Sequence, residues 1–88
     1  MKKYILDGKE FTSRDRAYKY MAQVLGFNDY FGSNLDALED SLWDLSGSEI
    51  DLIRARLVPR NLGDYGLSIL DVLADGQKKY DISLNIYW

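Results

Sequence analysis

The sequence of 88 residues contains no cysteine and no histidine, and it has a single proline. Without cysteine the chain cannot form a disulfide bond, a thiolate nucleophile or a thiolate-bound zinc site. Without histidine it also lacks the side chain that most often serves as a general base or metal ligand near neutral pH. We therefore expect no enzyme, no catalytic residue, no bound metal and no other cofactor.

Long apolar runs are also missing. The only apolar run near the start is Tyr4-Ile5-Leu6, which Asp7 ends, and this is too short for the core of a signal peptide. No stretch of the sequence is long enough to span a membrane. These absences predict a cytoplasmic protein that has no membrane partner.

Aromatic residues are abundant, with seven tyrosines, three phenylalanines and two tryptophans, and 47% of the residues are hydrophobic. Disordered chains are poor in such residues, so the composition indicates a folded protein. The length suits one hydrophobic core. We predict a single domain over residues 1–88 that is a monomer when free.

The net charge of −3 comes from fourteen acidic and eleven basic side chains, which are unevenly distributed. No lysine or arginine lies between Lys19 and Arg54, whereas seven acidic residues do: Asp29, Asp36, Glu39, Asp40, Asp44, Glu49 and Asp51. Nucleic acid would be repelled by this region. A field of one sign is better suited to a basic protein partner and to electrostatic steering of its association.

The hydrophobic patterns predict an α/β protein. The expected strands are 2–7, 49–54 and 81–88, the expected helices are 14–25, a second helix that follows Ser33, and 65–79, and 57–62 is a short helical turn or an irregular crossover. Helical connections between consecutive strands favour a three-stranded parallel sheet. Because Ser83 and Asn85 interrupt the last strand, we expect the helices mainly on one face.

The second helix has two different stripes. Ser33 stands three residues before Asp36, which is the spacing of a capping box. The stripes recur at helical spacing, one apolar with Leu35, Leu38, Leu42 and Leu45, and one mainly acidic with Asp36, Glu39, Asp40, Trp43 and Asp44. One side is therefore expected in the core and the other at the surface, where Tyr30 and Trp43 are candidate aromatic anchors beside the acids.

The acidic stripe is open to several interpretations. It can be a solvated helix face, with Asp36 stabilising the helix N-terminus. An acid and base pair is disfavoured, because two carboxylates on one helix face leave no room for a scissile bond, and a calcium site is disfavoured because the helix is not a metal-binding turn. Three functions remain open: an inhibitor of a basic ribonuclease, an acidic adaptor for another basic protein, and a small hydrolase or metal binder.

The segment 29–42, with the sequence Asp-Tyr-Phe-Gly-Ser-Asn-Leu-Asp-Ala-Leu-Glu-Asp-Ser-Leu, resembles the signature segment of the barstar family. This family consists of small intracellular inhibitors of barnase-type ribonucleases. The opening strand, the region of Ser68-Ile69-Leu70 and the ending Tyr80-Asp81-Ile82-Ser83-Leu84 are also similar to the family in order and spacing. The resemblance thus extends over nearly the whole chain.

The resemblance implies a barstar-like, two-layer fold and a mode of action. In the family, the acidic helix and the preceding loop enter the basic active-site cleft of the ribonuclease and form a 1:1 complex. Asp40 then matches the carboxylate in the phosphate site, Asp36 a neighbouring charge partner, and Tyr30 an aromatic residue that packs on the catalytic base. Asn34 and Leu35 match contacts beside them, and Asp75 matches a supporting acid on the last helix, although its side chain is one methylene shorter.

Two departures from the family pattern affect what is expected of the partner. Glu39 stands where barstar, the member that gives the family its name, has a tryptophan, so a charge replaces an aromatic contact. The cysteines of barstar are absent as well. We therefore expect the complementary surface of the partner to differ from that of barnase near Glu39.

Overall fold

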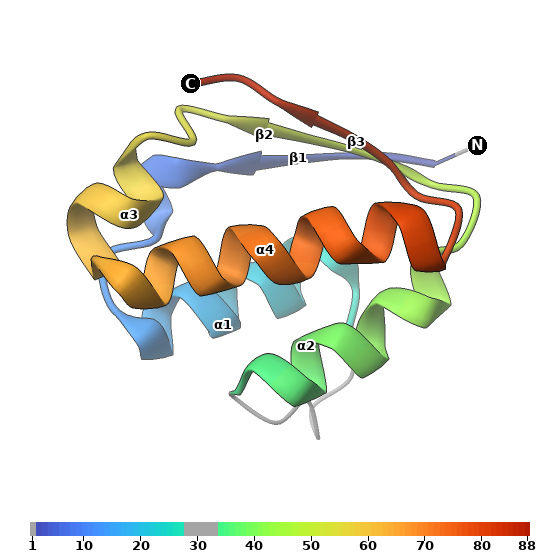
Figure 1. Ribbon diagram of the computed structural model, residues 1–88, viewed down its shortest axis with the longest axis horizontal. Helices are drawn as coiled ribbons and strands as arrows, with labels where there is room; N and C mark the ends of the chain where they lie inside the picture. The colour runs from blue at the N-terminus through green and yellow to red at the C-terminus, as the bar shows by residue number, and fades with distance from the viewer. Residues whose placement is uncertain (1, 28–33) are drawn as a thin grey trace.

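A computed structural model describes residues 2–27 and 34–88 of the chain, and its three strands form one parallel sheet (Figure 1). The strands are β1 (Lys3–Asp7), β2 (Glu49–Ile53) and β3 (Ser83–Ile86), in the order β1-β2-β3. In this register Ile50 lies opposite Tyr4 on one side and Leu84 on the other. The predicted α/β class and the parallel sheet are confirmed.

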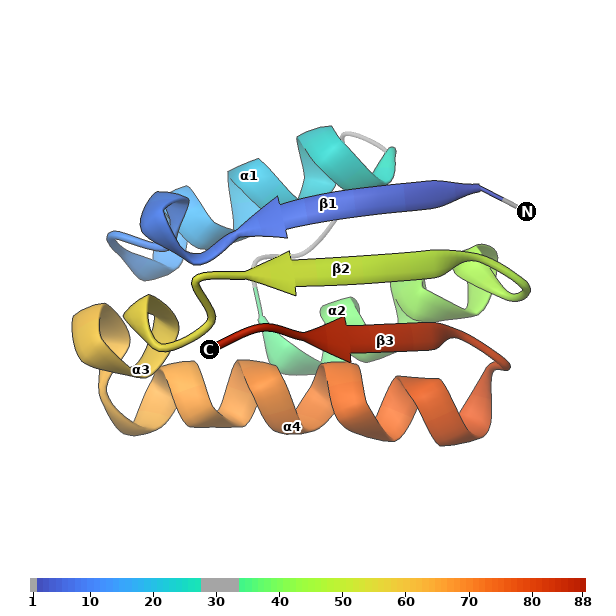
Figure 2. The same ribbon diagram turned by 90° about the horizontal axis from the view of Figure 1, so that it is seen from above.

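All helices lie on one face of this sheet, which confirms the expected one-sided, two-layer arrangement (Figure 1). The α-helices are α1 (Arg14–Leu25), α2 (Leu35–Leu42), α3 (Leu57–Leu62) and α4 (Asp64–Lys79), and two short 3-10 helices are η1 (Gly8–Glu10) and η2 (Trp43–Leu45). Seen from above, α1 runs beside β1 and α4 beside β3 (Figure 2). Within the helical layer, α2 lies farther from the sheet than α4 (Figure 1).

All three strands are shorter than the sequence indicates: β1 begins at Lys3 rather than at residue 2, and β3 ends at Ile86 rather than at residue 88. At two other strand ends the reason lies in the backbone. Arg54 and Asp81 both adopt left-handed backbone conformations, with φ of 50° and 56°. Such a conformation cannot continue an extended strand. β2 therefore ends at Ile53 rather than at residue 54, and β3 begins after Asp81, at Ser83.

The start of α2 also differs from the prediction. The N-cap is Asn34, whose Oδ1 accepts a hydrogen bond from the Ala37 amide at 2.8 Å, so the capping box of Ser33 and Asp36 was wrong. Asparagine caps helices as well as serine does. Because the backbone of Asn34 is extended, the helix begins at Leu35, one residue later than a cap at Ser33 would give. Asp36 is therefore the second helical residue, not the third, and it remains in the first turn beside the positive end of the helix dipole.

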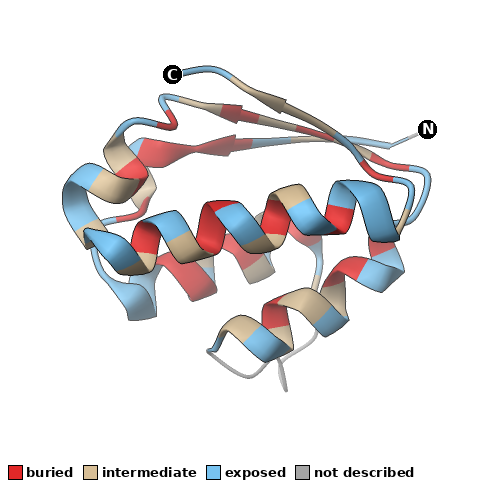
Figure 3. Cartoon of the chain, in the orientation of Figure 1, coloured by how far each residue is buried: buried red, intermediate tan, exposed pale blue. Residues whose placement is uncertain are grey.

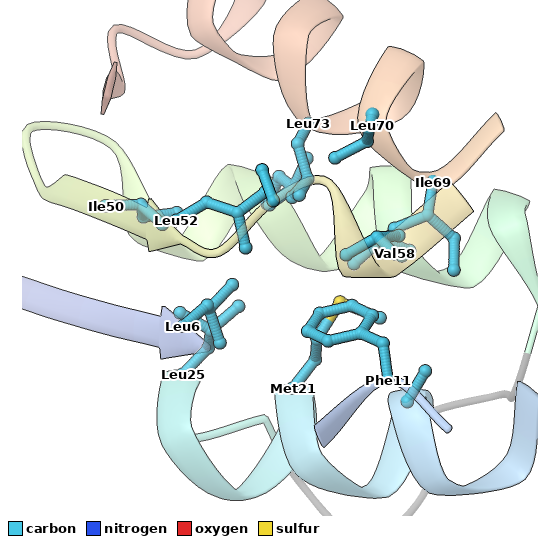
Figure 4. Close-up of a cluster of buried hydrophobic side chains, with 14 of the residues drawn as sticks. Leu6, Phe11, Met21, Leu25, Ile50, Leu52, Val58, Ile69, Leu70 and Leu73 are labelled. Carbon is cyan, nitrogen blue, oxygen red and sulfur yellow. The ribbon is translucent and has the colours of Figure 1, made fainter. Parts of the chain in front are cut away.

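The core fills the space between the sheet and the helices (Figure 4). The inward residues of the strands pack against apolar side chains of α1 and α4. The fully buried or nearly buried members include Leu6, Phe11, Met21, Leu25, Ile50, Leu52, Val58, Ile69, Leu70 and Leu73. Figure 3 shows buried and exposed residues alternating along α1, α2 and α4, as expected of helices with one side in the core.

Gly76 sets how closely α2 approaches α4. Glycine has a low helix propensity, so by sequence alone this residue only weakens the last turn of its helix. In the structure Gly76 is buried, and a Cβ atom at this position would lie 2.6 Å from Cδ1 of Leu42, which is also buried. Because Gly76 has no side chain, the side chain of Leu42 of α2 can pack directly against the backbone of α4.

The carboxyl ends of β1 and β2 are joined by a partly buried ion pair that should make stability depend on pH. Arg54 Nε donates to Asp7 Oδ1 at 2.9 Å, and the Lys9 amide donates to the same oxygen at 3.0 Å. The hydrogen bond from Arg54 holds the pKa of Asp7 below its ordinary value. Asp7 therefore stabilises the fold above its unfolded pKa of about 3.9, and this contribution is lost as pH falls through its folded pKa.

We expect Asp7→Asn to lower the free energy of unfolding by about 1 kcal/mol at pH 7 and by less at pH 2, because pH 2 lies below the unfolded pKa of about 3.9 and the contribution of the ionised carboxylate declines there. Urea unfolding of both proteins across this range measures the difference. Asp15→Asn is the matched control, because Asp15 forms an exposed pair with Lys19 on α1 and should change stability little at either pH. If Asp7→Asn lowered the free energy of unfolding equally at pH 7 and at pH 2, this role of Asp7 would be contradicted.

Candidate functional site

The acidic side of α2 is turned away from the core. Leu38 and Leu42 on the inner side are buried, and Leu35 is partly buried. The outer side of α2 carries three carboxylates, and η2, which follows directly, carries a fourth. We call these four the acidic face: Asp36, Glu39, Asp40 and Asp44. All are exposed except Glu39, which is of intermediate burial, so the two predicted stripes are separated as expected.

Cations are nearly absent from the acidic face. Within residues 2–27 and 34–88, its only ion pair joins Glu39 Oε1 to Lys79 Nζ of α4 at 3.2 Å. The hydrogen bond to Glu39 raises the pKa of Lys79 above its ordinary value. Asp36, Asp40 and Asp44 form no ion pair with any described residue, so their carboxylates are available to a partner without breaking an internal contact.

The residues at the start of α2 are only partly described. Tyr30 lies outside the described residues. Leu35 is partly buried at the first turn, and Asn34 is exposed although its side chain caps the helix. Asn34 therefore holds the start of the helix that carries the acidic face, a role that is independent of any partner.

We expect Asn34→Ala to lower the free energy of unfolding by about 1 kcal/mol, because the Ala37 amide loses its side-chain acceptor. Asn34→Ser is the matched control, since serine caps a helix about as well, and it should stay near wild type. Chemical denaturation of the three proteins measures the effect. Equal stability of Asn34→Ala and wild type would show that this cap does not stabilise the fold.

Trp43 and Asp75, two further predicted site residues, are both exposed. Trp43, in η2 just after α2, is 66% exposed, which is a large apolar surface to leave in water. Asp75 is exposed on α4 and directly precedes Gly76, the residue against which Leu42 packs.

Lys79 could not be recognised as part of this surface from the sequence, where it is only a residue of the last helix. Its contact with Glu39 joins residues 40 positions apart. The sequence shows that α2 has no cation of its own, but not which helix supplies one. The packing of α4 against α2, which includes the close approach of Gly76 to Leu42 one turn before Lys79, brings this ammonium group to α2.

Other kinds of site find no support in the described part of the chain. It contains no cluster of three or more acidic, histidine or cysteine side chains placed to hold a metal ion. None of its helices combines the length and the apolar character needed to cross a membrane.

Comparisons with known proteins identify the family of the chain. The sequence model of the family described as Barstar (barnase inhibitor) matches residues 1–87. A protein of Bacillus subtilis (strain 168) named "Putative ribonuclease inhibitor YrdF" is 32% identical over 81 residues, which cover 90% of this chain and 89% of that protein. A family match over almost the full length, together with this relative, shows that the chain belongs to the barstar family of barnase inhibitors.

Proposed function

We propose that this protein inhibits a barnase-type ribonuclease by placing the acidic face of α2 and the loop before it in the basic active-site cleft. The observation that carries the proposal is a set of exposed carboxylates, Asp36, Asp40 and Asp44, which form no ion pair with any described residue in this member of the barnase-inhibitor family. The name of the Bacillus subtilis relative supports the same role.

The chemistry of inhibition follows from the similarity of carboxylates and phosphates. Both are anionic oxygen acceptors that bind arginine and lysine through charge-assisted hydrogen bonds. Asp40, in the middle of the acidic face, occupies a phosphate position, and Asp36 binds a neighbouring cation. RNA and inhibitor then compete for the same cleft, and no covalent chemistry is needed.

The neighbouring residues complete the contact. Tyr30 packs on the catalytic base of the ribonuclease, and Asn34 and Leu35 contact the enzyme beside it. Trp43 and Asp44 lie at the rim, and Asp75 supports the charge from α4. A desolvated centre that is surrounded by a polar rim is the usual anatomy of such interfaces.

The helix is already formed before binding. Leu38 and Leu42 anchor α2 in the core, and Asn34 caps its start. The carboxylates are therefore held on a rigid element, and little conformational entropy is lost when a partner docks. We propose a free monomer in the cytoplasm that forms a 1:1 complex and protects the cell from its own ribonuclease or from a toxin.

Calorimetric titration with purified barnase-type ribonucleases, combined with a fluorogenic RNA cleavage assay, tests this function. We expect a 1:1 complex, with activity lost in step with complex formation. A panel of such enzymes, including any encoded beside this chain, that stays fully active at micromolar inhibitor would contradict the proposal. Binding without inhibition would instead identify the acidic face as an adaptor surface.

A further inference from the structure

The Glu39–Lys79 pair gives the acidic face a local charge pattern that differs from the rest of it. The Lys79 ammonium lies 3.2 Å from Glu39 Oε1, and the two side chains are 59% and 39% exposed. The pair is therefore open to solvent and to any partner that covers α2. At this place a partner meets one cation and one anion, whereas Asp36 and Asp40 present only negative charge.

The position of Lys79 in its own helix does not explain the pair. A cation in the last turn of a helix is favoured by the helix dipole, and Lys78 satisfies that preference equally well. Lys78 is exposed and forms no ion pair within the described residues. Of the two lysines, only Lys79 reaches α2. The helix dipole does not require this contact, which places a positive charge on the proposed docking surface.

The chemistry of the pair determines what can bind there. A lysine ammonium has three donors and no acceptor. One donor is used by Glu39, and the ammonium also lies 5.4 Å from the centre of the Tyr80 ring. Because the side chain is 59% exposed, a further donor can still reach a partner. An incoming arginine or lysine would be attracted by Glu39 but repelled by Lys79, whereas an oxygen acceptor can receive a hydrogen bond from Lys79.

We propose that Lys79 is a specificity-determining residue, which donates a hydrogen bond to an oxygen acceptor, a carboxylate or a main-chain carbonyl, at the edge of the basic cleft of the ribonuclease. The proposal rests on the proposed function and adds a requirement to it. Enzymes with an acceptor opposite Lys79 are bound well, and enzymes with a cation there are bound less well. Glu39 orients the ammonium from the inhibitor side.

The sign of one substitution separates this contact from general electrostatics. If Lys79 makes no contact, Lys79→Met removes a like charge from a surface that faces a basic enzyme, and binding should become tighter. If Lys79 donates to the enzyme, Lys79→Met should speed dissociation by about tenfold, because a charge-assisted hydrogen bond is lost. Lys78→Met is the matched control and should leave dissociation unchanged or slightly slower.

The same substitution in a protein that also carries Glu39→Gln shows whether Lys79 acts directly or only through Glu39. Dissociation rates are measured for wild type, Lys79→Met, Glu39→Gln and the double variant, with the barnase-type ribonuclease that binds wild type most tightly. We expect Lys79→Met to speed dissociation in the Glu39→Gln background as well. Melting temperatures close to wild type confirm that all variants are folded.

Three outcomes overturn the inference, and they can be told apart. Unchanged or slower dissociation of Lys79→Met shows that the lysine makes no favourable contact. An effect that disappears in the Glu39→Gln background shows that Lys79 only positions Glu39. If wild type itself binds no ribonuclease, the proposed function fails first, and this is visible without any variant.

Discussion

Replacing Asp40 with alanine should weaken the ribonuclease complex by about 2–5 kcal/mol, mostly through faster dissociation. This is the usual cost of truncating one partner of a buried, hydrogen-bonded charge pair in a protein complex. Asp40 lies in the middle of the acidic face, where a partner that covers Asp36 and Glu39 on either side excludes water. The partner's cation would then stay buried without its carboxylate.

Asp44→Ala is the matched control, because it removes the same group from the same side of the chain. Asp44 belongs to η2, beyond the end of α2, and is exposed. A charge at the rim changes the association rate and its salt dependence more than the dissociation rate. We therefore expect dissociation of Asp44→Ala to stay close to that of wild type.

Folding should survive both substitutions. Asp40 is exposed, lies opposite the buried Leu38 and Leu42, and forms no ion pair with a described residue. Its removal even relieves repulsion with Asp36, one turn away. Equal dissociation rates for the two alanine variants, or loss of the folded state in Asp40→Ala, would contradict the central position of Asp40.

Association should slow by about tenfold or more when salt is raised from about 10 mM to about 1 M, because the Debye length falls from about 30 Å to about 3 Å. A single-sign field steers an oppositely charged partner only while it reaches beyond the contact distance; barnase–barstar is a known example. Asp36, Asp40 and Asp44 have no cation beside them in the described structure, so their field is not neutralised internally.

Stopped-flow mixing with the ribonuclease measures this rate, and dissociation should change much less over the same range. Asp15→Asn provides a control of equal net charge change, because Asp15 lies on α1 and pairs with Lys19. It should alter association less than Asp44→Asn does. Association rates that stay flat from low to high salt would show that steering does not operate at this interface.

Much of the fold could be predicted because local patterns and tertiary packing agree. The leucines of α2 recur at helical spacing, and the structure buries Leu38 and Leu42 as that spacing requires. The polar Asn85 in the last strand led to the expectation of helices on one face, and its side chain indeed lies on the outer face of the sheet. There it donates to Glu49 Oε2 and Asp51 Oδ1, both at 2.8 Å.

The error at the start of α2 arose because two neighbouring residues are equally suited to be the N-cap. Ser33 and Asn34 are both good helix caps, and only the backbone conformation of Asn34 decides between them. Gly76 has a low helix propensity, yet it allows the close approach of Leu42. Lys79 could not be assigned to the acidic face from the sequence, because its place depends on how α4 crosses α2.

The most direct test of the central claim is the dependence of inhibition on RNA concentration. If the acidic face occupies the sites of RNA phosphates, inhibitor and substrate exclude each other. We then expect the inhibitor concentration that halves the initial cleavage rate to rise linearly with RNA concentration. A half-inhibitory concentration that does not change with RNA concentration would place the inhibitor outside the cleft and contradict the account.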